Sequence, residues 1–168
     1  GCLTCESSAQ WITMDFPATP PSQPVDASTH SLLLDILGVS PLFTGKSRED
    51  VLCVVDQEST VRDFQPDPLR LAQIEARGII LSAASDGPGI DFVSRFFAPR
   101  FGVNEDPVTG SAHCCLAPYW SDHFDRDELT GFQASGRGGI VRTKVKGDRV
   151  KLSGQAVTIM KASLLVGS

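Results

Sequence analysis

The chain is organised around one stretch of sequence, Asn104-Glu105-Asp106-Pro107-Val108-Thr109-Gly110-Ser111-Ala112-His113. Pro107 fixes its own φ and favours an extended conformation for Asp106. Gly110 lets the backbone approach a neighbouring group closely or adopt a positive φ. Ser111 can then cap a helix that begins at Ala112. The stretch therefore predicts a polar loop that leads into a helix.

The start of such a helix is a place where an anion can bind. Its first N–H groups have no partner within the helix, and the helix dipole adds a partial positive charge. Asp106 would then be a proton-transferring carboxylate beside an anion-binding group, which is half of a plausible active site. A structural alternative stays open, in which Asp106 only orders the turn and Ser111 only caps the helix.

The composition is that of a globular domain. The chain has 168 residues, of which 41% are hydrophobic and 21% charged, enough for one domain with its own core. With 15 basic and 20 acidic residues the formal charge is −5. This balance predicts no binding to nucleic acid or to an anionic membrane surface, and no apolar run has the length of a membrane span.

The cysteines favour a reducing compartment, and we expect a cytoplasmic protein. There are five of them, and an odd number with Cys114 and Cys115 adjacent does not suit a disulfide framework. Cys2 and Cys5 have the spacing of a zinc half-site, but no second pair follows, so we expect no metal site. Because the chain opens without Met, we also expect a truncated or processed start.

Periodicity and turn signals predict an α+β fold. Helices are expected at 30–37, where Ser28 or Thr29 is the cap, at 69–75 and at 112–124, while 60–64 is ambiguous. Residues 17–24 read as a proline-rich connector without a strand. Strands are expected at 10–16, 51–55, 78–84, 90–97, 130–135, 139–145, 149–152 and 156–166. Short strands joined by tight turns favour a curved, mostly antiparallel sheet around one buried helix, 112–124.

Several motifs are similar to those of the PhzF family, the phenazine-biosynthesis isomerases and their relatives. They are Met14–Pro17, Arg95–Pro99 with Gly102, Glu105–His113, Leu116–Trp120, Phe132–Ser135, Arg137–Gly139 and Gly154–Val157. The resemblance implies a diaminopimelate epimerase-like fold, in which two halves, each a sheet or barrel around a helix, face each other across a cleft. Residues 1–168 would be the C-terminal domain, with the N-terminal domain absent from this chain.

The resemblance also implies roles for individual residues. Asp106 would be catalytic in a proton shift, and Gly110 and Ser111 would bind the anionic group of a small substrate, with Thr109 and His113 as weaker candidates for substrate contact. A histidine such as His113 is more often a packed neighbour.

For other residues near the loop we expect mainly structural roles. Glu105 should point away from Asp106 in an extended segment and is read as structural. Cys114 and Cys115 are read as buried and inert, and Arg137 has a smaller chance of reaching an anion.

The implied activity is that of a cofactor-independent isomerase acting on a small carboxylate-bearing substrate, in a homodimer. The family's principal base is a glutamate of the first half, which nothing here matches, so we expect the chain alone to be inactive. The alternative is a non-catalytic module, either a pseudoenzyme half or a protein-interaction domain.

Overall fold

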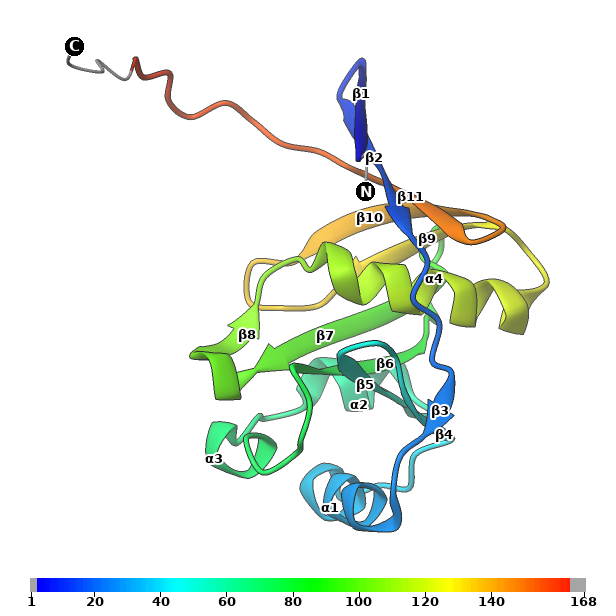
Figure 1. Ribbon diagram of the computed structural model, residues 1–168, viewed down its shortest axis with the longest axis vertical. Coiled ribbons are helices and arrows are strands. Elements are labelled where there is room, and N and C mark those ends of the chain that lie inside the picture. The colour runs from blue at the N-terminus through cyan, green and yellow to red at the C-terminus, as the bar shows by residue number, and fades with distance from the viewer. Residues whose placement is uncertain (1–2, 164–168) are drawn as a thin grey trace.

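The computed structural model describes residues 3–163, and they form one curved sheet with helices on both faces (Figure 1). The strand order is β1-β2-β11-β10-β9-β7-β6-β5-β4-β3, and β8 pairs with β7 off this path. The strands are β1 (Thr4–Ser8), β2 (Trp11–Pro17), β3 (Gln23–Pro24), β4 (Phe43–Lys46), β5 (Asp50–Val54), β6 (Gly78–Ala84), β7 (Phe92–Ala98), β8 (Val103–Asp106), β9 (Glu128–Gln133), β10 (Gly139–Lys146) and β11 (Arg149–Gly154). The path ends at β1 and β3, so the sheet is not closed into a barrel.

Most neighbouring strands are antiparallel, as predicted. The β6–β7 hairpin pairs Ile79 with Phe97 and Ala84 with Phe92. Two pairs are parallel, β5 with β6 and β7 with β9. Each parallel pair is joined through helices, because a parallel connection cannot be made by a tight turn.

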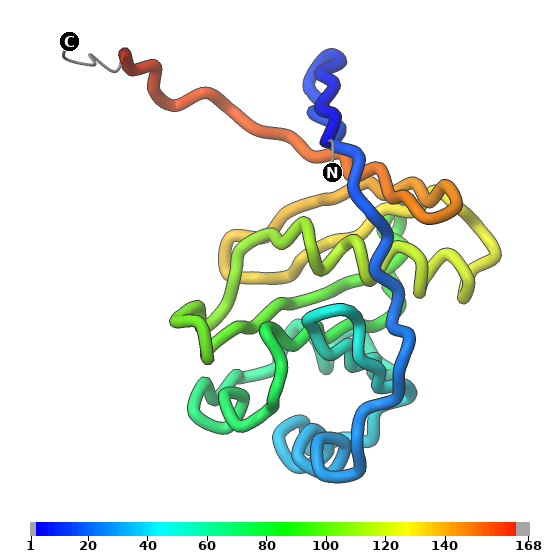
Figure 2. The backbone as a smooth tube through the Cα atoms, in the orientation of Figure 1, coloured from blue at the N-terminus to red at the C-terminus, as the bar shows by residue number. Residues whose placement is uncertain are grey.

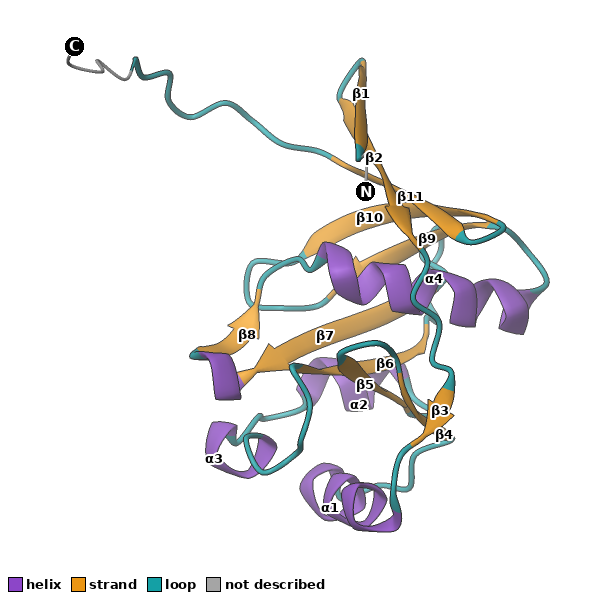
Figure 3. Ribbon diagram, viewed as in Figure 1, coloured by secondary structure: helices purple, strands orange, loops and turns teal. Residues whose placement is uncertain are grey.

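The helices lie in two layers (Figure 3). α1 (Ala27–Leu37), α2 (Glu58–Asp63) and α3 (Pro68–Leu71) cover the outer face of β5, β6 and β7. A short 3₁₀ helix, η1, spans Pro99–Phe101. The long helix α4 (Gly110–Phe124) lies on the inner face, between β6–β7 and the β9–β11 arm of the sheet.

The alternation of side chains along β5 shows how the two layers are filled. Val51 and Cys53 belong to the cluster under α1–α3, whereas Leu52 and Val54 belong to the cluster under α4. On its other side α4 places Cys114 and Ala117 against β10 and β11, in a third cluster. Buried on two opposite sides, α4 is the central helix that the sequence predicts around residues 112–124.

Pro118 lies inside α4, where a proline removes one backbone hydrogen bond. The acceptor left free is the carbonyl of Cys114, four residues earlier. It accepts a hydrogen bond of 2.9 Å from the N–H of Thr19, in the segment that runs along α4 between β2 and β3 (Figure 2). The proline therefore gives this crossing segment its attachment to α4.

Several predicted boundaries were wrong. The cap of α1 is Asp26, whose carboxylate accepts from the Thr29 N–H at 2.8 Å, so neither Ser28 nor Thr29 is the cap. The connector 17–24 contains the short edge strand β3, and the ambiguous residues fall in α2, up to Asp63. The helix predicted at 69–75 is shorter, ending at Leu71.

The strand predicted at 156–166 is absent from its described part: residues 156–163 run without regular structure away from the body of the protein (Figure 2), and 164–166 lie outside the described residues.

The described residues contain neither a membrane-spanning helix nor a cluster of metal ligands. No helix within 3–163 is both long and apolar enough to cross a membrane. Within the same range no three His, Cys, Asp or Glu side chains are grouped as a metal site would require. Cys2, half of the Cys2–Cys5 pair, is outside the described residues.

Candidate functional site

The loop that carries Asp106 begins at β8, on the margin of β7. Arg95 of β7 holds Glu105 in a two-point ion pair, with Nε to Oε1 at 2.7 Å and Nη2 to Oε2 at 2.9 Å. Only 7% of Arg95 is exposed, and its Nη1 donates to the Phe64 carbonyl at 2.5 Å. Glu105 is thus engaged in the structural role predicted for it, and Asp106 takes no part in that pair.

Asp106 is held by a buried polar network. The Thr109 hydroxyl donates to Asp106 Oδ2 at 2.5 Å, and the Gln133 amide donates to the Asp106 carbonyl at 2.7 Å. Gln133, at the end of β9, also accepts from the Thr109 N–H at 2.8 Å and donates to the Thr109 hydroxyl at 3.1 Å. The bond from Thr109 is the only one to the Asp106 carboxylate within residues 3–163, which leaves Oδ1 free for a ligand.

Residues 135–139, which follow Gln133, also hold the Asp106 loop. The Ser135 hydroxyl donates to the Pro107 carbonyl at 2.7 Å and accepts from the Gly138 N–H at 3.1 Å. A Cβ at Gly139 would lie only 2.4 Å from a methyl of Val108, so a glycine is needed for β10 to pass beneath the loop. The motifs at 132–135 and 137–139 are therefore the support of the Asp106 loop. Arg137 itself is exposed.

The beginning of α4 differs from the prediction in one respect. The N-cap is Thr109, and Ser111 lies inside the first turn, so the prediction that Ser111 caps the helix was wrong. Thr109 makes no side-chain capping bond: its hydroxyl donates to Asp106 and accepts from the Gln133 amide. Gly110 does not have a positive φ, and a Cβ there would meet nothing nearer than Leu152 at 3.9 Å.

His113 is fully buried, with 0% exposure, one turn into α4. Its Nδ1 lies 2.8 Å from the Thr109 carbonyl, so this nitrogen carries the proton, and Nε2 has no hydrogen-bond partner within the described residues. Burial lowers the pKa of His113 to about 4. Neither His113 nor Thr109, which is 7% exposed, offers its side chain to solvent in this structure.

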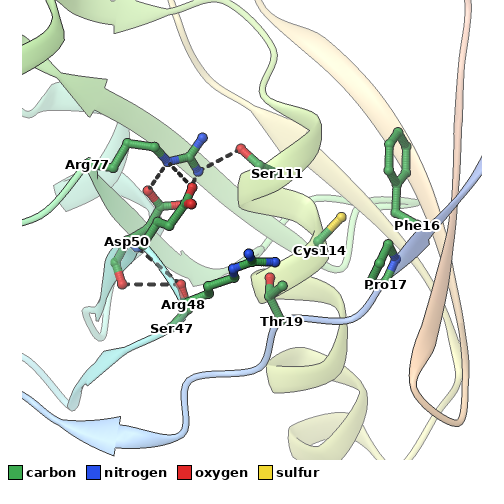
Figure 4. Close-up of a pocket in the computed structure, with 10 residues that line it drawn as sticks. Phe16, Pro17, Thr19, Ser47, Arg48, Asp50, Arg77, Ser111 and Cys114 are labelled. Carbon is green, nitrogen blue, oxygen red and sulfur yellow. Dashed lines mark hydrogen bonds and ion pairs between the residues drawn. The ribbon is translucent and has the colours of Figure 1, made fainter. Parts of the chain in front are cut away.

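Two cavities lie close to the loop, one at the first turn of α4 and one at Val108, and Asp106 lines neither of them. One, of about 230 Å³, is lined by Ser111 and Cys114 of α4, by Phe16 and Pro17 at the end of β2, and by Thr19, Ser47, Arg48, Glu49, Asp50 and Arg77 (Figure 4). The other, of about 1050 Å³, is lined by Val108, Arg137 and the β1–β2 turn among others.

Sequence reasoning missed two side chains at this site. Gln133 was noted only as part of a motif, and Arg77, which donates to the Ser111 hydroxyl at 2.9 Å, was noted only as the end of a helix. Both lie far from the loop in the chain, 27 and 34 residues from their respective partners, so no local pattern could have identified them.

The cysteines of α4 are buried, as predicted. Cys114 is 5% and Cys115 0% exposed. Burial raises the pKa of Cys114 to about 11 and that of Cys115 to about 12, so both remain protonated thiols near neutral pH. Cys53 is likewise buried and Cys5 exposed, and all four are free.

Comparison with known proteins agrees with this architecture. The profile of the family described as phenazine biosynthesis-like protein (PhzC-PhzF) matches residues 5–162. An uncharacterized isomerase of Halalkalibacterium halodurans is 45% identical over 166 residues, which cover 99% of this chain and 62% of the relative. An uncharacterized isomerase of Pseudomonas aeruginosa is 41% identical over 159 residues, which cover 95% of this chain and 59% of the relative.

The crystal structure of an Enterococcus faecalis protein of the PhzF family superimposes with a TM-score of 0.84 at 32% identity, over 96% of this chain and 60% of that one. A predicted epimerase of P. aeruginosa shares the fold with a TM-score of 0.67. The chain therefore spans about 60% of the length of these relatives. Its fold is α+β and epimerase-like, and the chain belongs to the PhzC-PhzF family of phenazine biosynthesis-like proteins.

Proposed function

We propose that this chain carries part of the active site of a PhzF-like isomerase. The reaction is the removal of a proton beside an activating group of a small carboxylate-bearing substrate, cyclic or amino-acid-like, and its return at another position. Asp106 assists the proton transfer, and Gly110 and Ser111 bind the substrate's anion. No cofactor or metal is assigned to the reaction.

The observation that carries the proposal is the use made of the Thr109 hydroxyl. An N-cap threonine ordinarily satisfies an orphan N–H of its own helix. Here the Thr109 oxygen accepts from the Gln133 amide instead, and its proton is donated to Asp106 Oδ2. The first turn of α4 therefore lacks this cap, Gly110 has no crowding neighbour, and a carboxylate is fixed three residues before Thr109. Open N–H groups beside a fixed acid suit an anionic substrate that exchanges a proton.

Thr109 and His113 are buried partners of the loop, and we propose that they position the loop without contacting the substrate. Thr109 holds the Asp106 carboxylate, and the side chain of His113 does not reach solvent, so we assign both residues to positioning. The uncharged imidazole of His113 donates to the Thr109 carbonyl. The proton removed by one group is returned by its conjugate acid, so the atoms and charges balance without a redox partner.

We further propose that the principal base comes from outside the matched residues, as the family resemblance implies. The carboxylate next to Asp106 in the sequence, Glu105, is engaged by Arg95. Since the relatives are longer than this chain, their remaining segment is the proposed source of the base and of the facing wall of the site.

The test is proton exchange with solvent. A panel of small cyclic and amino-acid carboxylates is incubated in D₂O with the chain alone, and with the chain plus the unmatched segment of the H. halodurans relative. Deuterium incorporation is then followed by NMR. We expect exchange only with the added segment, and Asp106→Asn should lower its rate about 10²- to 10⁴-fold. The matched control is Asp122→Asn, an exposed aspartate of α4.

Clear turnover by the chain alone would remove the need for an outside base. Undiminished exchange in Asp106→Asn would remove the catalytic role of Asp106.

A non-catalytic module is the second candidate, favoured by one observation. Val157, Ile159 and Met160 are 85%, 93% and 77% exposed, in a segment that extends away from the domain. Such side chains suit a partner surface. A chain that binds the unmatched segment tightly but catalyses no exchange with any carboxylate of the panel would support this candidate.

We also propose a cytoplasmic location and a homodimer. The first rests on the free thiols of the described residues, which suit a reducing compartment. The second rests on the family resemblance and is checked by sedimentation equilibrium.

A further inference from the structure

Arg77 joins the start of β6 to the first turn of α4. Its backbone N–H donates to the Glu49 carbonyl at 2.8 Å, which fixes the main chain just before Gly78. Its side chain crosses to α4, where Nη2 donates to the Ser111 hydroxyl at 2.9 Å (Figure 4). One guanidinium thus connects two elements that are distant in the sequence.

The guanidinium is held in place by Asp50, which is 4% exposed. Nε donates to Oδ1 at 3.0 Å and Nη2 to Oδ2 at 2.5 Å, the two-point geometry that suits arginine and a carboxylate. Glu49 adds a second carboxylate at 3.2 Å. Burial raises the pKa of Asp50, an effect opposed by these bonds, and the pKa of Arg77 is raised by the same pair. The single positive charge of Arg77 therefore faces two carboxylates, those of Asp50 and Glu49.

A guanidinium has only donors and cannot accept a hydrogen bond. The Ser111 oxygen must therefore be the acceptor in its bond with Arg77, and the serine's own proton is left to be donated elsewhere. No acceptor for that proton is found within residues 3–163. The hydroxyl of Ser111, which is exposed, is thus free to donate its proton to a ligand at the uncapped start of α4.

We infer that Arg77 is a positioning residue that orients the Ser111 hydroxyl as a donor, so that the site favours a carboxylate, which accepts a charge-assisted hydrogen bond, over the neutral carbonyl of an amide and over an amine, which only donates. This inference rests on the proposed function, which places the substrate's anion at Gly110 and Ser111. It adds Arg77 and Asp50 as the means by which that site distinguishes anions from neutral groups.

The test is a double-mutant cycle with benzoate as the anionic probe and benzamide as its neutral counterpart. Binding is followed through the backbone amide resonances of Gly110 and Ser111 in Arg77→Lys, Ser111→Ala and the double variant. Lysine keeps a charge beside Asp50 but not the forked geometry. We expect Arg77→Lys to weaken benzoate about three- to tenfold and benzamide by less than about twofold.

The coupling between the two substitutions separates positioning from mere structural support. In the Ser111→Ala background, Arg77→Lys should change benzoate binding by less than about twofold, because the hydroxyl through which it acts is gone. An equal loss in both backgrounds, or an unchanged benzoate affinity in Arg77→Lys, would overturn the inference.

A second measurement needs no change at Arg77, in case that variant does not fold. The side-chain NH resonances of Arg77 should shift when benzoate is added to the original protein but not to Ser111→Ala, and shifts of equal size in both would contradict the inference. If benzoate moves neither the Gly110 nor the Ser111 amide of the original protein, the proposed anion site itself is wrong. That result differs from a failure of the Arg77 role alone.

Discussion

Asp106 owes its position to a side chain 27 residues further along the chain. Gln133 is completely buried and bonds the loop at the Asp106 carbonyl and at both the N–H and the hydroxyl of Thr109. A buried amide with all its groups paired holds a loop more rigidly than surface contacts can. The position of Asp106 in the proposed site is therefore fixed by buried hydrogen bonds.

The substitution Gln133→Glu should loosen this loop. It keeps the shape but replaces the NH₂ donor, leaving the Asp106 carbonyl and the Thr109 hydroxyl without it and adding a buried carboxylate. We expect a loss of about 2–3 kcal/mol of unfolding free energy, measured by urea denaturation. Gln65→Glu is the matched control, since Gln65 also donates to an aspartate carbonyl, that of Asp63 at 3.2 Å, but at the surface. Equal losses in the two variants would show that Gln133 has no special role.

His113 should make stability fall as the pH is lowered. Its pKa in the folded protein is about 4, against an ordinary value of 6.5. Above 6.5 both states are neutral and nothing is lost. Between 6.5 and 4 the unfolded chain takes up a proton that the folded chain refuses, so stability decreases, by about 2 kcal/mol at pH 5.

The measurement is urea denaturation between pH 7 and pH 5, with His113→Gln as the control. The other titrating groups contribute to both proteins, so the original protein should show the steeper decline. Parallel curves would exclude this role of His113.

The local sequence around Asp106 was enough to predict the loop, the helix after it and the separate role of Glu105. It was not enough to predict which distant side chains hold the loop and the first turn of the helix. The curvature of the sheet brings Gln133 and Arg77 to their partners, and the periodicity of the sequence does not predict that curvature. The cap was also misassigned, because the helix begins at Gly110 rather than at Ala112: the backbone of Thr109 is extended and Gly110 is already helical.

Among the elements, α4 has the most unusual feature, a proline at the position where it frees the Cys114 carbonyl for Thr19. Strands and helices with clear periodicity were predictable: β6 matches its predicted range, Gly78–Ala84. Parallel pairing was not, since which strands become neighbours depends on how helices pack between them. The described part of the segment predicted as a strand at 156–166 has strand-like residues but no strand beside it, so its propensity is not realised.

Pro118→Ala should weaken the attachment of the crossing segment. Alanine restores an N–H that competes for the Cys114 carbonyl, so we expect the Thr19 amide to exchange with solvent about fivefold faster. The neighbouring Ala18 amide, which donates to the Asp148 carbonyl at 2.8 Å, is an internal control and should not change. An unchanged Thr19 rate would mean that the carbonyl serves both donors.

At the scale of the whole molecule, the described residues form three apolar clusters: β5–β7 separate the first from the second, and α4 separates the second from the third. Because α4 is packed between two arms of the sheet, neither arm can lose its contacts without exposing the helix. The two tryptophans report on separate regions: Trp120 is buried in α4, and Trp11 in β2 lies under the Arg142 guanidinium, 3.9 Å from its ring centre.

We therefore expect the described domain to unfold in one cooperative step. In Trp11→Phe and Trp120→Phe the remaining tryptophan follows a different region, and the urea midpoint seen by fluorescence in each variant should coincide with the midpoint seen by circular dichroism. A fluorescence midpoint well below that of circular dichroism in the variant that retains Trp11 would mean that β1 and β2 separate before the core.

The pairing of β2 with β11 has a consequence for synthesis on the ribosome. Phe16 is opposite Val150, and Asp15 accepts from Arg149, 134 residues later. An early strand must therefore remain unpaired on that side until nearly the whole domain has been translated, and α4 emerges before the strands β9–β11 that cover it. Closing so long a loop is slow, and the uncovered helix meanwhile exposes apolar surface. A cell that makes this protein quickly should thus need chaperones most in the interval between the emergence of α4 from the exit tunnel and the emergence of β11.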